Sequence, residues 1–155
     1  NIQKLKGTRS VSVISTDTSY IIYTLGFTRK PKGVEIEYHA LLNFLLSMQR
    51  EPVIQNTDIL LSVTTYSFDI SILEFFAPLI SGASIYIVSD EILKDPVSTI
   101  QIIRQVNPTI IQATPSFYQL LFNAGWEGTN SLKILCGGDL LSNALLNLLI
   151  KSCGQ

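Results

Sequence analysis

The sequence is poor in the residues that charge-driven or cysteine-based functions require. Only 15% of its 155 residues are charged, and the net charge at pH 7 is −1. Such a balance gives no electrostatic reason to expect nucleic acid or an anionic membrane as a partner. Cys136 and Cys153 are the only cysteines. Without a CxxC pair or a Cys/His cluster, they predict neither a disulfide framework nor a metal site.

Long apolar runs are also missing. Asn, Gln, Asp, Pro or Gly interrupts each run before it could cross a bilayer, and no cationic-then-apolar leader is visible at the start. The hydrophobic content of 46% nevertheless argues against disorder, and the length suits one domain. We therefore expect a cytoplasmic globular protein.

The apolar residues that are present follow an alternation of strands and helices. Consecutive apolar strands separated by helices predict an α/β fold, with a mostly parallel sheet and helices on both faces. Residues 1–18 are polar and aperiodic, so we expect an irregular segment there and the domain at 19–155. The predicted strands are Tyr20–Thr24, Asp58–Thr64, Ser84–Val88, Thr109–Ala113 and Lys133–Cys136, and the predicted helices are Tyr38–Met48, Ile70–Ile80, Pro96–Val106, Pro115–Ala124 and Ser142–Ser152.

A segment rich in Gly, Thr and Lys lies between the first strand and the first helix, from Thr24 to Val34. Glycines let a backbone approach phosphate closely, N–H and hydroxyl groups donate to its oxygens, and lysines neutralise its charge. The Walker spacing is absent, and a polar turn is the simpler alternative on chemistry alone. The candidate phosphate-binding residues are Thr24, Gly26, Thr28, Lys30, Lys32 and Gly33.

The run from Tyr20 to Val34 resembles the signature loop of adenylate-forming enzymes, Y-x-x-Y-T-S-G-S-T-G-K-P-K-G-V. Further blocks in the family's order match at Ile36–Glu37, Leu41, Asn43–Phe44, Tyr66–Glu74, Gln112–Ser116 and Leu132–Asp139. The chain is most similar to part of an amino-acid-activating adenylation domain of a nonribosomal peptide synthetase. The resemblance implies part of the family's large N-terminal domain and ATP-dependent activation of an amino acid substrate. It also implies ATP and Mg²⁺ as cofactors, with other synthetase domains or a carrier protein as partners.

The candidate phosphate loop departs from the family pattern at three positions. Leu25 and Phe27 replace hydroxyl residues, and Arg29 replaces a glycine. Each lost hydroxyl donor to a charged phosphate removes about 1.5–3 kcal/mol of interaction. Tolerance of these changes by a shifting loop is an alternative.

The family's Y-G-P-T-E segment and its lid with a catalytic lysine do not occur in the sequence. We therefore assign no catalytic or metal residue, and we expect the chain to be inactive alone. One half of a split enzyme and a non-catalytic interaction module are the alternatives.

The same resemblance indicates a substrate pocket. Asp69 matches the acid that binds the substrate's α-amino group, although a helix N-cap is its alternative role. His39, the only histidine, is expected to be a surface or capping residue, and Trp126 a packing anchor. The predicted pocket residues are Asp69, Ile70, Leu73, Gln112, Leu135 and Gly137, for which ordinary core packing is the alternative.

Overall fold

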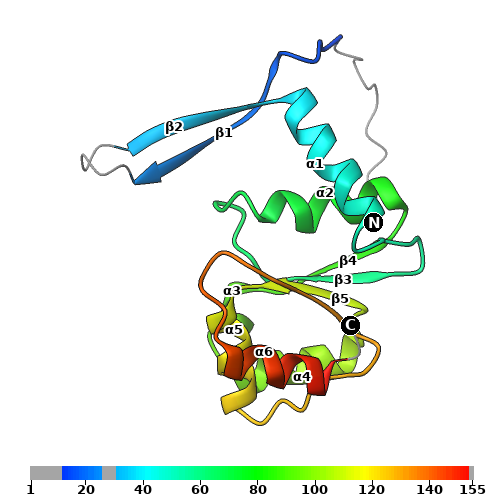
Figure 1. The fold of residues 1–155 in the computed structure, drawn as a ribbon, viewed down its shortest axis with the longest axis vertical. Helices are drawn as coiled ribbons and strands as arrows, with labels where there is room; N and C mark the ends of the chain where they lie inside the picture. Colours follow the sequence, from blue (N-terminus) through cyan, green and yellow to red (C-terminus); the bar gives the residue numbers. More distant parts are fainter. Residues whose placement is uncertain (1–11, 26–30, 154–155) are drawn as a thin grey trace. The chain divides into compact units, whose positions relative to one another are not determined.

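A computed structural model describes residues 12–25 and 31–153 of the chain (Figure 1). The chain consists of two compact units, Asn1–Phe44 and Leu45–Gln155. The elements in chain order are β1 (Thr18–Leu25), β2 (Pro31–Glu37), α1 (Tyr38–Arg50), β3 (Ile59–Ser62), α2 (Ser71–Ser81), β4 (Ser84–Ile87), α3 (Asp90–Leu93), α4 (Pro96–Val106), β5 (Ile110–Ala113), α5 (Pro115–Asn123), β6 (Lys133–Cys136) and α6 (Asn143–Ser152).

In the first unit, β1 and β2 form an antiparallel hairpin. The strand expected at Tyr20–Thr24 is confirmed, but the expectation of a loop as far as Val34 is wrong. From Pro31 the backbone is extended and pairs with β1, which satisfies its polar groups. The last four residues of β2, from Val34 to Glu37, alternate apolar and acidic side chains with the period of a strand. The Gly and Lys content of the preceding residues obscures this alternation.

The start of α1 also belongs to the first unit. His39 is largely exposed, and its Nδ1 lies 3.0 Å from an oxygen of Glu37 and 3.3 Å from the carbonyl oxygen of Ser15. This confirms the expected surface position of the histidine. Residues 12–17 contain turns but neither helix nor strand.

The second unit contains a four-stranded parallel sheet in the order β4-β3-β5-β6. Helix α2 covers one face of this sheet, and α4, α5 and α6 cover the other (Figure 1). The predicted α/β class, with helices on both faces of a mostly parallel sheet, is therefore confirmed. The core on the α4–α6 side contains Leu61, Ile111 and Ala113 of the sheet with Ile100, Ile103, Tyr118, Leu121, Leu145 and Leu149 of the helices.

Local signals account for the helix boundaries on that side. Side-chain oxygens of Asp95, Thr114 and Ser142 accept hydrogen bonds from the first turns of α4, α5 and α6. Proline at the first position of α4 and α5 suits a residue without an N–H group. The predicted range of α4 is confirmed. The short helix α3 lies just before the Asp95 cap of α4.

Two buried aromatic residues join the core to the sheet. The Tyr118 hydroxyl donates to the carbonyl oxygens of Ile111, at 2.9 Å, and Leu135, at 3.2 Å, which links β5 and β6. Trp126 is 4% exposed and stacks on Tyr118, with its ring also 5.2 Å from that of Phe122. The expected packing role of Trp126 is confirmed.

No helix in residues 12–25 or 31–153 combines the length and the apolar character that crossing a membrane requires.

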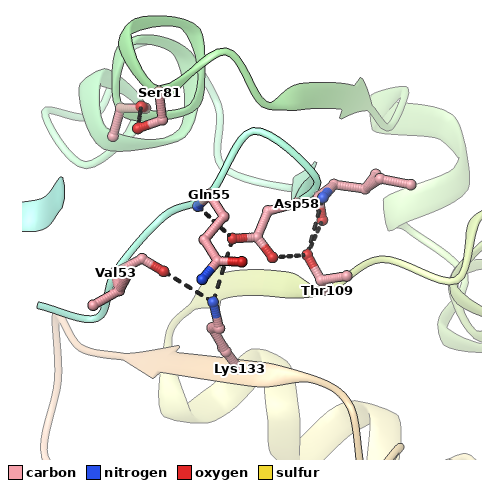
Figure 2. A network of polar contacts seen from close by, with 8 residues as sticks. Val53, Gln55, Asp58, Ser81, Thr109 and Lys133 are labelled. Carbon is pink, nitrogen blue, oxygen red and sulfur yellow. Dashed lines mark hydrogen bonds and ion pairs between the residues drawn. The ribbon is translucent and has the colours of Figure 1, made fainter.

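A polar network joins the amino ends of the central strands (Figure 2). The Asp58 carboxylate accepts hydrogen bonds from the Thr109 hydroxyl at 2.7 Å and the Gln55 N–H at 2.8 Å, and it lies 3.3 Å from Lys133 Nζ. Lys133 also donates to the carbonyl oxygen of Val53 at 2.9 Å. Burial raises the pKa of Asp58, but these donors and the lysine charge outweigh it, so that the pKa is lowered overall. The network therefore stabilises the ionised carboxylate.

Candidate functional site

The carboxyl ends of the parallel strands form the edge at which a ligand site is expected. From β3 the chain crosses to β4 on one side, and β5 then pairs with β3 on the other side. Ligands of open α/β sheets bind where the strand order reverses in this way. The connections that follow β3, β5 and β6 begin at this edge. The six predicted pocket residues lie in these connections, in the adjoining strands or in the first turn of α2.

Glu74 is the central polar residue beneath α2. Its carboxylate is fully buried and accepts hydrogen bonds from the Ser62 hydroxyl at 2.7 Å, the Thr64 hydroxyl at 2.6 Å and the Thr64 N–H at 3.1 Å. Burial raises the pKa of Glu74, and these hydrogen bonds, which favour the ionised form, offset the rise only in part. These hydrogen bonds connect the first turns of α2 to the end of β3 and to the residues just after it.

Gln112 reaches the same carboxylate from the neighbouring strand. With its amide oriented so that both polar atoms find partners, Nε2 donates to Glu74 at 3.1 Å and Oε1 accepts from the N–H of Ala113 at 3.2 Å. Gln112 is paired in register with Leu135 of β6. Because paired residues of a sheet point to the same face, Leu135 shares the α2 face with Gln112. The structure therefore brings these two predicted residues together.

The remaining pocket residues border this region. Leu73 of α2 is buried, whereas Ile70 before the helix and Gly137 after β6 are half-buried. Asp69 is exposed and lies in the connection from β3 to α2. Its alternative role as a helix cap is wrong, because the N-cap of α2 is Ile70 and no side chain caps this helix.

The candidate phosphate segment is described at its two flanks. Thr24 near the end of β1 is paired in register with Lys32 near the start of β2, and both are exposed. Gly33 is paired with Tyr23, and an added Cβ there would lie only 3.2 Å from Cγ2 of Ile21. Lys32 and Gly33 thus belong to a strand and not to a loop. The predicted residues Gly26, Thr28 and Lys30, and the substituted positions Phe27 and Arg29, lie outside the described residues.

The hairpin carries groups that can bind a phosphate. The residues with these groups, Thr24 with a hydroxyl and Lys32 with an ammonium, are paired near the end of β1 and the start of β2. Thr24 and Lys32 are thus the described residues that would hold the phosphates of ATP. Over the ranges 12–25 and 31–153, no three His, Cys, Asp or Glu side chains come together as a metal site. Mg²⁺ in nucleotide sites is commonly held by one or two carboxylates and the phosphates themselves.

Sequence reasoning missed the roles of Glu74, Ser62 and Thr64. Glu74 was part of a matched motif without an assigned role, although an acidic residue in an otherwise apolar helix is a signal in itself. A buried carboxylate needs donors, and Ser and Thr at the end of an apolar strand supply them. This signal indicates a buried polar cluster but does not identify its members.

Comparisons with known proteins identify the family and the fold of the chain. Residues 3–155 match the family model described as AMP-binding enzyme. The chain is 44% identical over 138 residues to a dimodular nonribosomal peptide synthase of Bacillus subtilis (strain 168). The aligned region covers 89% of this chain and 6% of that protein.

Two solved structures are also similar. A four-domain nonribosomal peptide synthetase, solved in a holo form bound to AMP and glycine, superposes with a TM-score of 0.82 and 36% identity over 89% of this chain and 10% of its own. The N-terminal subdomain of Klebsiella oxytoca NpsA, in complex with 3-hydroxybenzoyl-AMSN, gives a TM-score of 0.82 over 99% of this chain and 39% of its own. Its 20% identity shows the shared fold alone.

The chain thus spans a small part of the length of these relatives. The family match nevertheless covers almost all of the chain, and the parallel sheet with its two helical layers is that of an N-terminal adenylation subdomain. The chain therefore belongs to the AMP-binding enzyme family, and it corresponds to a section of the adenylation domains of nonribosomal peptide synthetases.

Proposed function

We propose that the chain serves as a section of an amino-acid adenylation domain in nonribosomal peptide synthesis, and that alone it binds the amino acid without activating it. The observation that carries this proposal is the group of pocket residues on the α2 face, at the point where the strand order reverses. The 36% identical synthetase bound to AMP and glycine supports an amino acid as the substrate.

Asp69 is the proposed partner of the substrate's α-amino group. Its exposed carboxylate is not engaged in capping α2, and a carboxylate pairs strongly with an ammonium group. Ile70, Leu73 and Leu135 supply apolar walls beside it. Other synthetase domains and a carrier protein are the proposed partners for the steps that follow activation.

The phosphate segment is the proposed reason for the missing activation. Thr24 and Lys32 retain a donor and a charge, but Leu25 and Phe27 carry no hydroxyl. Two lost donors at about 1.5–3 kcal/mol each amount to about 3–6 kcal/mol, or roughly 100- to 10,000-fold in affinity. Arg29 adds a positive charge but does not restore the backbone freedom of glycine.

The amino acid site is tested by NMR titration of the full chain with glycine, using Asp69→Asn as the variant and Asp90→Asn, on the exposed start of α3, as the control. We expect saturable binding that Asp69→Asn weakens at least about tenfold, as loss of a charge-assisted contact requires. Equal binding by the parent and by Asp69→Asn would contradict the amino-group role.

The phosphate segment is tested separately by ATP–pyrophosphate exchange and by Mg-ATP titration. We expect no exchange by the chain alone, whereas replacing Leu25 and Phe27 by Ser and Arg29 by Gly should raise Mg-ATP affinity at least about 100-fold. Exchange by the unchanged chain would show that its phosphate segment is functional. An unchanged nucleotide affinity in the restored variant would show that these three residues do not limit binding.

A further inference from the structure

We propose that Ser71 and Glu74 are positioning residues for amino acid binding, because they hold the two ends of the connection that carries Asp69. This inference rests on the proposed function and names the groups that keep the Asp69 backbone in place at the edge of the sheet. Both side chains belong to the first turn of α2. Residues three positions apart on a helix lie on the same face, so both can reach the connection from one side.

The connection between β3 and α2 gains little order from the packing of its own side chains. Residues 65–69 are all exposed, and the aromatic side chains of Tyr66 and Phe68 are 84% and 62% exposed. A segment with few buried apolar contacts opens easily unless hydrogen bonds hold it. Ser71 and Glu74 are by contrast only 2% and 0% exposed. The order of the connection therefore depends on the buried polar groups at its two ends.

Glu74 holds the beginning of the connection. Its carboxylate accepts hydrogen bonds from the Thr64 hydroxyl at 2.6 Å and from the Thr64 N–H at 3.1 Å. The Ser62 hydroxyl, at the end of β3, donates to the same carboxylate at 2.7 Å. Hydrogen bonds to a carboxylate are stronger than those to a neutral acceptor. Both the side chain and the backbone of Thr64 are therefore fixed to α2.

Ser71 holds the end of the connection. Its hydroxyl donates to the carbonyl oxygen of Phe68 at 2.7 Å and, more weakly, to that of Tyr66 at 3.4 Å. No side chain caps α2, so this hydroxyl is used on the connection instead. The Ile72 N–H donates to the carbonyl oxygen of Asp69 itself at 3.0 Å. The backbone at Asp69 and just before it is therefore tied to the first turn of α2.

A fixed backbone raises the affinity of the Asp69 carboxylate for an ammonium group. If the connection samples other conformations, the observed affinity falls in proportion to the fraction of molecules in which the carboxylate is in place. Removing one hydrogen bond shifts such an equilibrium about 2- to 13-fold. Loss of either end of the connection should therefore weaken amino acid binding without any change in the groups that contact the ligand.

The test is NMR titration of the full chain with glycine, combined with hydrogen exchange of the amides at positions 68 and 71, which donate within the connection. We expect Ser71→Ala to weaken glycine binding about 3- to 10-fold and to speed the exchange of both amides at least about threefold. Ser98→Ala removes a hydroxyl bonded to Asp95 in the first turn of α4 and is the matched control. It should leave glycine affinity within about twofold of the parent.

Two further comparisons separate positioning from a general loss of stability. Because Ser71 acts through Asp69, Ser71→Ala should change glycine affinity less than about twofold when Asp69 is already replaced by Asn. Glu74→Ala frees the other end of the connection and provides a second variant if Ser71→Ala does not fold. It should also weaken binding, and Glu74→Gln, which keeps a carbonyl acceptor for Thr64, should recover most of the lost affinity.

The outcomes distinguish this inference from the proposed function. Unchanged glycine affinity in a folded Ser71→Ala variant would overturn the inference and leave the proposed function standing. An equal loss of affinity with and without the Asp69→Asn change would overturn it as well, because the serine would then act elsewhere. Absence of glycine binding by the parent chain would overturn the proposed function and this inference with it.

Discussion

Replacing Glu74 by alanine tests how strongly the buried carboxylate holds α2 to the sheet. The change removes the acceptor of three hydrogen bonds from Ser62 and Thr64 and of a fourth from Gln112. Each buried donor left without a partner costs about 1–3 kcal/mol. The two hydroxyls can rotate toward other acceptors, but the Thr64 N–H and the Gln112 amide cannot. We therefore expect a loss of about 3–5 kcal/mol in the free energy of unfolding.

The assay is urea unfolding followed by circular dichroism, with a shift in midpoint at constant slope as the readout. Glu74→Gln keeps the shape of the side chain and one carbonyl acceptor, so its loss should be only about 1–2 kcal/mol. Glu91→Ala, at an exposed glutamate of α3, is the matched control and should change stability by less than about 0.5 kcal/mol. A loss below about 1 kcal/mol for Glu74→Ala would refute the reasoning.

The pH dependence supplies a second check on Glu74. Because the pKa of this carboxyl is raised in the folded state, its stabilising contribution is fully present below the unfolded value of 4.5 and is lost as pH rises through the folded pKa. Glutamine does not titrate. The stability advantage of the parent over Glu74→Gln should therefore shrink as pH rises above 4.5. An advantage that grows with pH would contradict the assigned direction.

Four further substitutions test the second unit. Gly125 and Gly128 both have positive φ, but only at Gly128 would an added Cβ overlap the backbone oxygen of Ser152. Calorimetry should therefore show a loss of about 1–2 kcal/mol for Gly125→Ala and clearly more for Gly128→Ala; equal losses would contradict the overlap. Since the pKa of Asp58 is lowered, its contribution is present above the unfolded value of 3.8 and lost as pH falls through the folded pKa. Asp58→Asn should thus be less stable at neutral pH, by about 1–3 kcal/mol in urea titrations, with a gap that closes in acid. Tyr118→Phe removes the donor to two strand carbonyls and should lower stability by about 1–3 kcal/mol in the same titrations; an unchanged midpoint would show that the hydroxyl contributes nothing.

Features encoded within a few consecutive residues could be predicted from the sequence. Asp95 followed by Pro96 and by apolar residues at helical spacing sets the start and the buried face of α4. The short apolar strands likewise predict a covered parallel sheet, because only a strand buried on both faces is apolar at successive positions. The matched motifs carried the family assignment for the same reason, since each is a local run of residues.

Alternatives that depend on neighbours in space could not be decided in this way. Asp69 stood one residue too early to cap α2, which only the observed helix start reveals. The strand character of Lys32 and Gly33 depends on their pairing with β1. The same pairing places Thr24 opposite Lys32. Antiparallel pairing satisfies backbone groups that a composition of Gly and Lys suggests are free.

The buried polar contacts belong wholly to the tertiary structure. Gln112 meets Glu74 from 38 positions away only because β5 pairs with β3 beneath α2, and Lys133 meets Asp58 across a sequence separation of 75 residues. The sequence by itself determined the class, the family and the elements other than β2 and α3, because propensity, capping and motifs act over short stretches of chain. The order and register of the strands decided which buried donors meet which acceptors, because a low-dielectric interior leaves polar groups only the partners that packing brings within reach.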